Sequence, residues 1–176
     1  MNKYLITGGE GLVGRALVRK LKDTNNQVYF TTRKEVDLFD FNQTLKYFKE
    51  VSPTHLINAA AKVGGIKTNN DKPADFIFEN LQIQNNVIKA AAELKINKFI
   101  FLGSSCIYPR DAKQPISEDA LLTGPLEPTN EWYAIAKIAG LKMTQAYRKQ
   151  YNLKWISIMP NNVYGPFDNF NPQSAD

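Results

Sequence analysis

The feature that most constrains the fold of this chain is a glycine-rich turn close to the N-terminus. Gly8, Gly11 and Gly14 follow an apolar run at residues 4–6 and open a segment whose apolar side chains recur at helical spacing. Glycine permits a tight turn and close approach of the backbone to a pyrophosphate, while the dipole of a helix N-terminus attracts phosphate charge. Such a turn can exist without a ligand, but the flanking strand and helix favour dinucleotide binding, with the phosphates over residues 11–13. The predicted phosphate-turn residues are Gly8, Gly9, Glu10, Gly11, Leu12, Val13 and Gly14.

Strand-like and helix-like patterns alternate along the rest of the chain. Apolar, β-rich runs predict strands at residues 28–30, 55–60, 98–102 and 155–159. Apolar positions at helical spacing predict helices at residues 41–51, 74–94 and 131–151. This alternation predicts right-handed βαβ units, and nearly unbroken apolar strands are buried on both faces of a parallel sheet. We therefore expect an α/β fold of the Rossmann type, with a doubly wound parallel sheet.

Composition limits the classes of function open to the chain. At 176 residues and 43% hydrophobic content, one domain with a substantial core is expected, and no apolar run is long enough to span a bilayer. The N-terminus carries no secretory signal pattern, so a cytoplasmic location without a membrane partner is expected. The sequence has one cysteine, Cys106, and one histidine, His55, so neither a disulfide within the chain nor a metal site is predicted. The net charge of +5 is scattered, which suits small anionic ligands better than nucleic acid.

The end of the second predicted strand bears on the choice of nicotinamide cofactor. A protein that prefers NAD places an acidic residue there, on the ribose 2′-hydroxyl. This chain instead has two threonines followed by Arg33 and Lys34, which favour a 2′-phosphate and hence NADP(H). Glu10, in the glycine turn, would repel that phosphate, so NAD stays open as the alternative.

Tyr133 and Lys137 are candidates for acid–base chemistry. They stand four residues apart, so both project from one face of the predicted helix. A phenol with a reference pKa of about 10 is a poor base at neutral pH, but a neighbouring cation favours the phenolate. Tyr133 can then give a proton to the alkoxide that forms when a hydride reaches a ketone. Ser104, just past the strand at 98–102, can hydrogen-bond the same oxygen, and Ser105 is the less favoured alternative.

These motifs resemble the extended short-chain dehydrogenases, which carry the glycine turn, the strand-end serine and the Tyr-x-x-x-Lys pair in this order. Six further segments are similar to the GDP-L-fucose synthase family: residues 60–66, 103–109, 115–116, 121–124, 126–131 and 164–170. The resemblance implies NADPH-dependent conversion of GDP-4-keto-6-deoxymannose to GDP-L-fucose, by epimerisation at C3 and C5 and reduction of the C4 ketone. It also implies a C-terminal substrate domain that is absent here. Residues 1–166 are expected to form the NADP-binding domain, and residues 167–176 the start of a truncated substrate-binding region.

The resemblance also implies roles for individual residues. Ser104, Tyr133 and Lys137 match the reductase residues, and Cys106 matches a cysteine that transfers protons during epimerisation. A buried, unreactive thiol is the alternative for Cys106. Implied cofactor contacts comprise Leu102, Gly103, Ser104, Ser105, Lys137, Pro160, Asn161, Asn162 and Val163 toward the nicotinamide, and Arg33, Lys34, Asp37 and Leu38 toward the 2′-phosphate.

One departure from the family pattern concerns the acid that works with the cysteine. The family has a histidine a few residues beyond residue 170, and by counting this place falls on Asp176, the final residue, so either the histidine was replaced or the chain ends first. Aspartate is a poor general acid at neutral pH because its reference pKa is low, so impaired epimerisation is expected. His55 cannot readily substitute, since it precedes a strand and therefore lies at the opposite edge of the sheet.

The partners expected from the resemblance are a GDP-sugar substrate and a second copy of the chain. The family dimerises through two long helices, which here correspond to residues 74–94 and 131–151. Two other interpretations stay open. The chain could be another nucleotide-sugar epimerase or dehydratase that uses Tyr133 and Lys137 on a different sugar. It could also be a catalytically silent dinucleotide-binding module, or a subunit completed by a separately encoded C-terminal chain.

Overall fold

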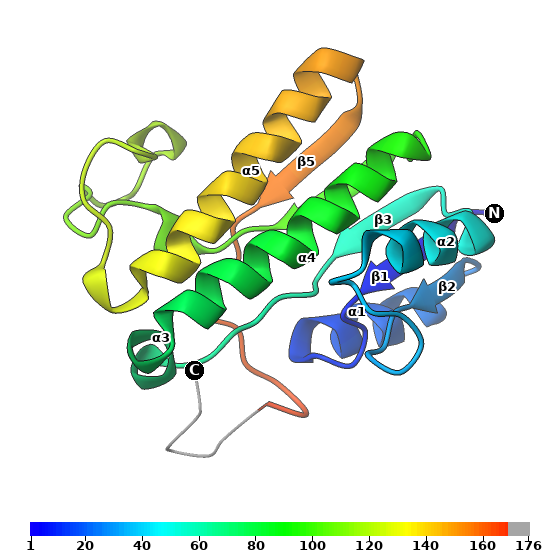
Figure 1. Ribbon diagram of the computed structural model, residues 1–176, viewed down its shortest axis with the longest axis horizontal. Helices are drawn as coiled ribbons and strands as arrows, with labels where there is room; N and C mark the ends of the chain where they lie inside the picture. Colours follow the sequence, from blue (N-terminus) through cyan, green and yellow to red (C-terminus); the bar gives the residue numbers. More distant parts are fainter. Residues whose placement is uncertain (169–176) are drawn as a thin grey trace.

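The computed structural model describes residues 1–168 and contains a parallel sheet (Figure 1). Its five strands run in the order β2-β1-β3-β4-β5, and each neighbouring pair is parallel. The strands are β1 (Lys3–Thr7), β2 (Gln27–Phe30), β3 (His55–Asn58), β4 (Lys98–Leu102) and β5 (Lys154–Ile158). The predicted α/β fold with a parallel sheet is confirmed.

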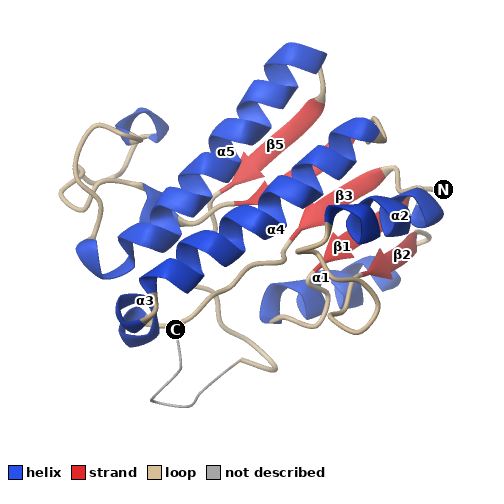
Figure 2. Ribbon diagram, viewed as in Figure 1, coloured by secondary structure: helices blue, strands red, loops and turns tan. Residues whose placement is uncertain are grey.

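Helices connect the strands and cover both faces of the sheet (Figure 2). They are α1 (Leu12–Lys22), α2 (Phe41–Val51), α3 (Ile66–Asp71), α4 (Pro73–Glu93) and α5 (Glu131–Tyr151). The helices α2, α4 and α5 lie side by side on one face, and α1 lies on the other (Figure 1). This distribution follows from right-handed crossovers, because the strands are added in one direction from β1 to β2 and in the other from β3 to β5.

The direction in which strands are added to the sheet reverses between β1 and β3. This reversal places a crevice between the carboxyl ends of these two strands. In open parallel sheets, ligands bind at this switch point because the connections leave it on opposite faces. The two strand ends are joined by a short hydrogen bond, 2.6 Å from the Thr7 hydroxyl to Asn58 Oδ1, and both residues are buried. The amide of Ala60 also donates to the Thr7 oxygen, at 3.3 Å. The floor of the crevice is therefore fixed by paired polar groups.

The core lies between the sheet and the helices α4 and α5. Phe99, Phe101 and Trp155 are fully buried, and the Trp155 indole N–H donates to the carbonyl of Ile96 at 2.8 Å. The two helices pack closely at Gly140, where an added Cβ would lie 2.4 Å from the Phe101 ring and 2.6 Å from the Gln84 side-chain oxygen. This close packing holds the first turn of α5 against the end of β4, where the predicted catalytic residues lie.

The structure differs from the predicted elements mainly in short segments. The strand predicted at 55–60 ends at Asn58, because residues 59–65 turn away from the sheet toward α3. The helix α3 was not predicted, since its six residues are too few to show a helical period. Among the described residues, three single turns of 3-10 helix were not predicted for the same reason. They are Ser105–Ile107, Glu118–Ala120 and Pro128–Asn130.

Within residues 1–168, the model has no helix long and apolar enough to cross a lipid bilayer. The strand β5 forms one edge of the sheet as far as the structure describes it. Trp155 points toward α5, where its ring stacks on Tyr147, so Ile156 and Ile158 lie on the opposite face. Both isoleucines are exposed, at 47% and 43%. This end of the sheet therefore presents an apolar strip to the solvent.

Candidate cofactor and active site

The phosphate turn is a close junction between β1 and α1. Gly8 has a φ of 70°, in the left-handed region that glycine adopts without strain. A Cβ added at Gly14 would lie 2.1 Å from the Gly8 carbonyl oxygen and 2.8 Å from the Gly9 Cα. Glycine at position 14 therefore lets the helix approach the turn closely.

The N-terminus of α1 is open toward the crevice. Gly11 precedes the helix and makes no side-chain capping hydrogen bond, and the first turn of the helix carries no acidic residue. The Gly11 N–H donates to the Gly8 carbonyl at 3.1 Å, so it is already used inside the turn. The first turn of α1, which begins at Leu12, has further N–H groups that can donate to a phosphate.

A hollow of about 360 Å³ adjoins the turn, between the carboxyl ends of β1, β2 and β3. Thr31 holds two of these ends together, since its hydroxyl and carbonyl accept hydrogen bonds from the N–H groups of Gly8 and Gly9 at 3.0 and 3.1 Å. The lining includes the predicted residues Gly8, Glu10, Gly11, Arg33, Asp37 and Leu38, and also Thr31, Thr32, Val36, Phe39, Ala59, Ala60, Ala61, Glu79 and Ile83. Lys34 does not line it.

The charges around this hollow are unevenly distributed. Among the described residues that line it, Arg33 supplies the positive charge and Glu10, Asp37 and Glu79 carry carboxylates. Glu79 is already paired, because Lys62 forms a salt bridge with it. A ribose 2′-phosphate in this hollow would therefore depend on Arg33 for its electrostatic partner.

Lys137 lies buried beneath the carboxyl end of β4. Its ammonium donates to the Leu102 carbonyl at 2.9 Å and lies 5.7 Å from the centre of the Tyr133 ring. Only 4% of Lys137 is exposed, and this desolvation lowers its pKa from 10.5 to about 8. Tyr133 is in the first turn of α5, where its ring contacts Phe76 edge-on. The structure thus brings together the phenol and ammonium that the spacing predicted.

The residues after β4 bring a hydroxyl and a thiol to the same edge. Ser104 caps a short turn, with its Oγ accepting the N–H of Cys106 at 3.3 Å. Ser105 instead contacts the segment after β5, donating from its hydroxyl to the Asn161 side-chain oxygen at 3.1 Å and from its N–H to the Pro160 carbonyl at 3.3 Å. Ser105 therefore joins two strand ends, while Ser104 lies beside Cys106.

Asn130 is a residue of this site that the sequence analysis missed. Its side-chain amide donates to the Cys106 sulfur at 3.2 Å. The chain contains no periodic signal for this contact, because Asn130 belongs to a 3-10 turn just before α5 and lies 24 residues from the cysteine. Ala59, Ala60 and Ala61, which line the hollow beside the phosphate turn, were also not predicted, although their place at a strand end was a usable signal.

Val163 lies beside the phosphate turn, whereas His55 is remote from the site. Val163 is 51% exposed and lines a groove against α1 that is also lined by Gly9, Glu10, Leu12 and Val13 of the phosphate turn. His55 begins β3 at the other edge of the sheet, where its ring stacks on Tyr4 at 4.5 Å. Burial and the charge of Lys98 lower the His55 pKa. The prediction that His55 is remote from the site is confirmed.

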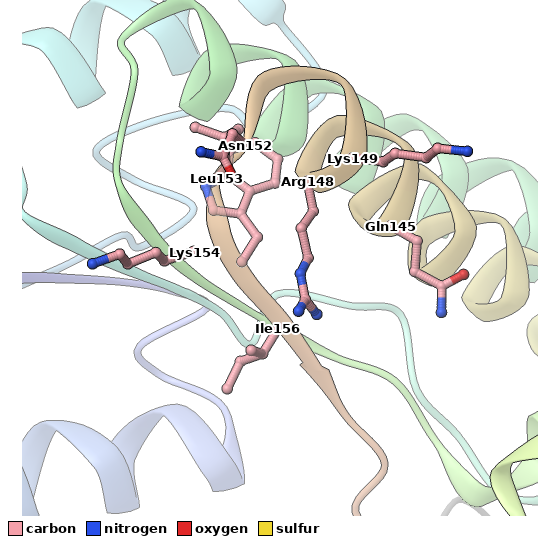
Figure 3. Close-up of a pocket in the computed structure, with 8 residues that line it drawn as sticks. Gln145, Arg148, Lys149, Asn152, Leu153, Lys154 and Ile156 are labelled. Carbon is pink, nitrogen blue, oxygen red and sulfur yellow. The ribbon is translucent and has the colours of Figure 1, made fainter.

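A further hollow lies at the amino end of β5 (Figure 3). Arg148 and Lys149 from the last turn of α5 border it, together with Lys154 and Ile156 from β5 (Figure 3). Strand starts face away from the switch point, so this hollow is not the candidate site. Within residues 1–168, no three His, Cys, Asp or Glu side chains cluster closely enough to hold a metal ion.

Comparison with known proteins agrees with this fold. Residues 4–176 match the NAD dependent epimerase/dehydratase family, and the chain belongs to that family. It is 55% identical over 174 residues to GDP-L-fucose synthase 1 of Arabidopsis thaliana, with 98% of this chain and 54% of that protein covered. It is 48% identical over 174 residues to GDP-L-fucose synthase of Escherichia coli strain K12, with the same coverage. The chain thus spans about half the length of these curated relatives.

Solved structures are similar over nearly the whole chain. The GDP-mannoheptose C4 reductase MlghC from Campylobacter jejuni, solved with NADP bound, superposes with a TM-score of 0.91 at 39% identity, covering 98% of this chain and 51% of that one. A GDP-L-fucose synthetase from Naegleria fowleri bound to NADP gives a TM-score of 0.84 at 31% identity, covering 96% and 52%.

Proposed function

We propose that this chain forms the cofactor-binding and reductase half of an enzyme that converts GDP-4-keto-6-deoxymannose to GDP-L-fucose with NADPH. The observation that carries the proposal is the buried Lys137, which is held by the Leu102 carbonyl under the ring of Tyr133 and close to the end of β4. A charge is costly to bury, so a lysine in this position requires a compensating role. The GDP-L-fucose synthases among the relatives support the choice of substrate.

The proposed cofactor fits the residues at the switch point. The uncapped N-terminus of α1 suits the pyrophosphate, and the hollow beside it has a size suited to an adenosine. Arg33 would hold the 2′-phosphate, while Ser105 and Asn161 would flank the nicotinamide end. Two structural relatives with NADP bound support NADP(H) over NAD.

In the proposed reduction, bound NADPH supplies a hydride to the C4 ketone carbon. The Tyr133 hydroxyl gives its proton to the oxygen, which becomes the product hydroxyl, and the Lys137 charge stabilises the phenolate that remains. Ser104 supports the same oxygen. Its Oγ accepts the N–H of Cys106, which leaves its own O–H to donate to the substrate. The phenolate regains a proton from solvent to complete the cycle.

Epimerisation is the second part of the proposal. Cys106 is partly exposed at the same edge, where its sulfur can exchange a proton with a sugar carbon beside the ketone. The residue expected to act with it, Asp176, lies outside the described residues. Because aspartate is a weaker candidate than histidine for a general acid, we propose that epimerisation is slower than reduction in this protein.

The test is a titration of the purified chain with NADPH, followed by addition of GDP-4-keto-6-deoxymannose. Saturable binding, oxidation of NADPH and formation of GDP-L-fucose would support the whole proposal. Binding without oxidation would limit the chain to a dinucleotide-binding module. Absence of binding to either NADPH or NADH would contradict the proposed function.

A second candidate is a GDP-sugar C4 reductase that does not epimerise. The similarity to MlghC, a GDP-mannoheptose C4 reductase, favours it. The two functions differ in hydrogen exchange at C3 and C5. In D₂O without NADPH, the epimerase would introduce deuterium at these carbons, whereas the simple reductase would not.

We also propose that the chain forms a homodimer through the outer surfaces of α4 and α5. These helices pack side by side, and two large apolar side chains remain exposed on them, Phe78 at 62% and Trp132 at 44%. Burial of such side chains against a second copy would remove apolar area from water.

A further inference from the structure

The side chain of Asn130 contacts the thiol of Cys106, and Asn130 immediately precedes the helix that carries Tyr133. Its amide N–H contacts the Cys106 sulfur at 3.2 Å, and Tyr133 follows three residues later in the first turn of α5. Asn130 thus donates a side-chain hydrogen bond to this sulfur. The contact therefore links the element that carries the thiol to the helix that carries the phenol.

The turn that carries Asn130 has a defined geometry. The Glu127 carboxylate accepts the N–H of Thr129 at 3.3 Å and its hydroxyl at 3.1 Å. The Asn130 N–H in turn donates to the Glu127 carbonyl at 3.2 Å. These bonds fix the backbone just before α5, so the Asn130 amide approaches the sulfur from a set direction.

We propose that Asn130 is a positioning residue for Cys106, whose amide N–H orients the sulfur and favours its thiolate. The assignment of the proton transfer to Cys106 rests on the proposed function. A hydrogen bond donated to the charged form of a group stabilises that form, and the thiolate is the reactive state of cysteine. Asn130 would therefore control how readily Cys106 accepts a proton.

The side-chain oxygen of Asn130 supports a role of this residue in binding a ligand. The Asn130 side-chain oxygen is buried and makes no hydrogen bond with the described residues. A buried acceptor without a partner is unfavourable, so a donor from outside the chain would relieve it. A sugar hydroxyl is such a donor, and it would hold the sugar beside the sulfur. One amide would then align the base and its substrate.

The proposed proton transfer needs a base, an oxygen that takes up the electron pair of the broken bond, and an acid. The Cys106 thiolate takes a proton from the carbon next to the ketone, forming an S–H bond. The electron pair of the broken C–H bond moves into an enolate, whose charge lies on the ketone oxygen near Tyr133 and Ser104. An acid on the opposite face returns a proton to the carbon, which completes the inversion.

Reactivity of the single cysteine tests the inference without any enzymatic assay. The chain has one cysteine, so the rate at which iodoacetamide adds mass to the protein at pH 7.5 reports Cys106 alone. Asn130→Asp keeps the side-chain shape and removes the donor, and the expected result is a rate about tenfold lower, the scale of a hydrogen bond to a charged group. Asn130→Leu removes the donor without adding charge and should change the rate in the same direction.

Two controls separate this role from a structural one. Thr129→Ala alters the same turn without touching the sulfur, and its rate should stay within about twofold of the parent. In denaturant all variants should react equally, because the contact exists only in the folded chain. Unchanged alkylation in a folded Asn130→Asp or Asn130→Leu protein, confirmed by circular dichroism and NADPH binding, would overturn the inference.

Deuterium exchange then connects the contact to the reaction. Incorporation of deuterium into GDP-4-keto-6-deoxymannose without NADPH should slow in Asn130→Asp, while the affinity for NADPH stays unchanged. If the parent protein exchanges no deuterium but shows the predicted alkylation pattern, the proposed epimerase function fails and the Asn130 contact stands. Equal exchange in the parent and the variant would contradict the positioning role.

Discussion

Lys137 illustrates how the surroundings of one residue set its chemistry. Its burial lowers the pKa to about 8, while the carbonyl of Leu102 fixes its ammonium near Tyr133. The sequence predicted this pair because a four-residue spacing puts two side chains on one helical face. It could not predict the depth of burial, which depends on contact between α5 and the end of β4. It also could not predict the contact from Asn130 to Cys106, which is made by a turn without periodicity.

The depressed pKa of Lys137 predicts a pH dependence of stability. The unfolded chain has a lysine pKa of about 10.4, so between pH 8 and 10 it binds more protons than the folded chain. Stability should therefore rise with pH in this window, by about 2 kcal/mol, relative to Lys137→Met. Urea unfolding of both proteins at pH 7 and pH 10 measures this difference. Equal changes in the two proteins would contradict the buried charge.

Arg33 is predicted to decide the preference between the two nicotinamide cofactors. It is the cation among the described residues that line the adenosine-sized hollow. Arg33→Ser should weaken NADPH binding by about tenfold or more and leave NADH binding nearly unchanged, since a charged hydrogen bond to the 2′-phosphate is lost. Fluorescence titration with each cofactor gives the ratio. Lys34→Ser is the matched control, because Lys34 does not line the hollow. An equal loss for both cofactors in Arg33→Ser would place the 2′-phosphate elsewhere.

At the scale of elements, the regular helices and strands were predicted within about two residues. Their apolar periodicity reflects burial between the sheet and its helices, which sequence alone records well. Segments without periodicity were not predicted, and these include α3 and the turns that shape the rim of the site. The parallel, doubly wound sheet was predicted from general rules for βαβ units rather than from particular residues, and the order of the strands was not predicted.

The junction of β1 with α1 predicts different outcomes for two glycine substitutions. In Gly14→Ala the new Cβ would lie 2.1 Å from the Gly8 oxygen, so the turn must move and stability should fall by about 1–3 kcal/mol. In Gly11→Ala the nearest atom is 3.4 Å away and the φ of −74° is compatible with alanine, so stability should be retained. NADPH binding should nevertheless weaken in both, because the methyl group of Gly11→Ala adjoins the phosphate position. Thermal unfolding and cofactor titration separate the two effects, and equal stability of both variants would contradict the close junction.

At the scale of the whole molecule, the exposed apolar strip on β5 is the feature that the sequence could not reveal. Ile156 and Ile158 alternate with inward-facing residues as in any buried strand, so their exposure becomes visible only in the folded chain. The chain spans about half the length of its curated relatives.

The proposed dimer predicts a change in mass for one surface substitution. Phe78→Glu places a charge on the exposed surface of α4, and the protein should become a monomer. Tyr29→Glu, on the distant strand β2, should leave the parent mass unchanged and serves as the control. Sedimentation velocity measures all three proteins. A parent protein that is already monomeric would refute the dimer.

The central claim, reduction of a GDP-linked ketone through Tyr133, is tested most directly by comparing the parent chain with Tyr133→Phe. NADPH affinity and the rate of NADPH oxidation with GDP-4-keto-6-deoxymannose are measured for both proteins. We predict equal affinity and a rate at least about 100-fold lower in the variant, because the proton donor to the developing alkoxide is lost. Equal oxidation rates in the two proteins would contradict the claim.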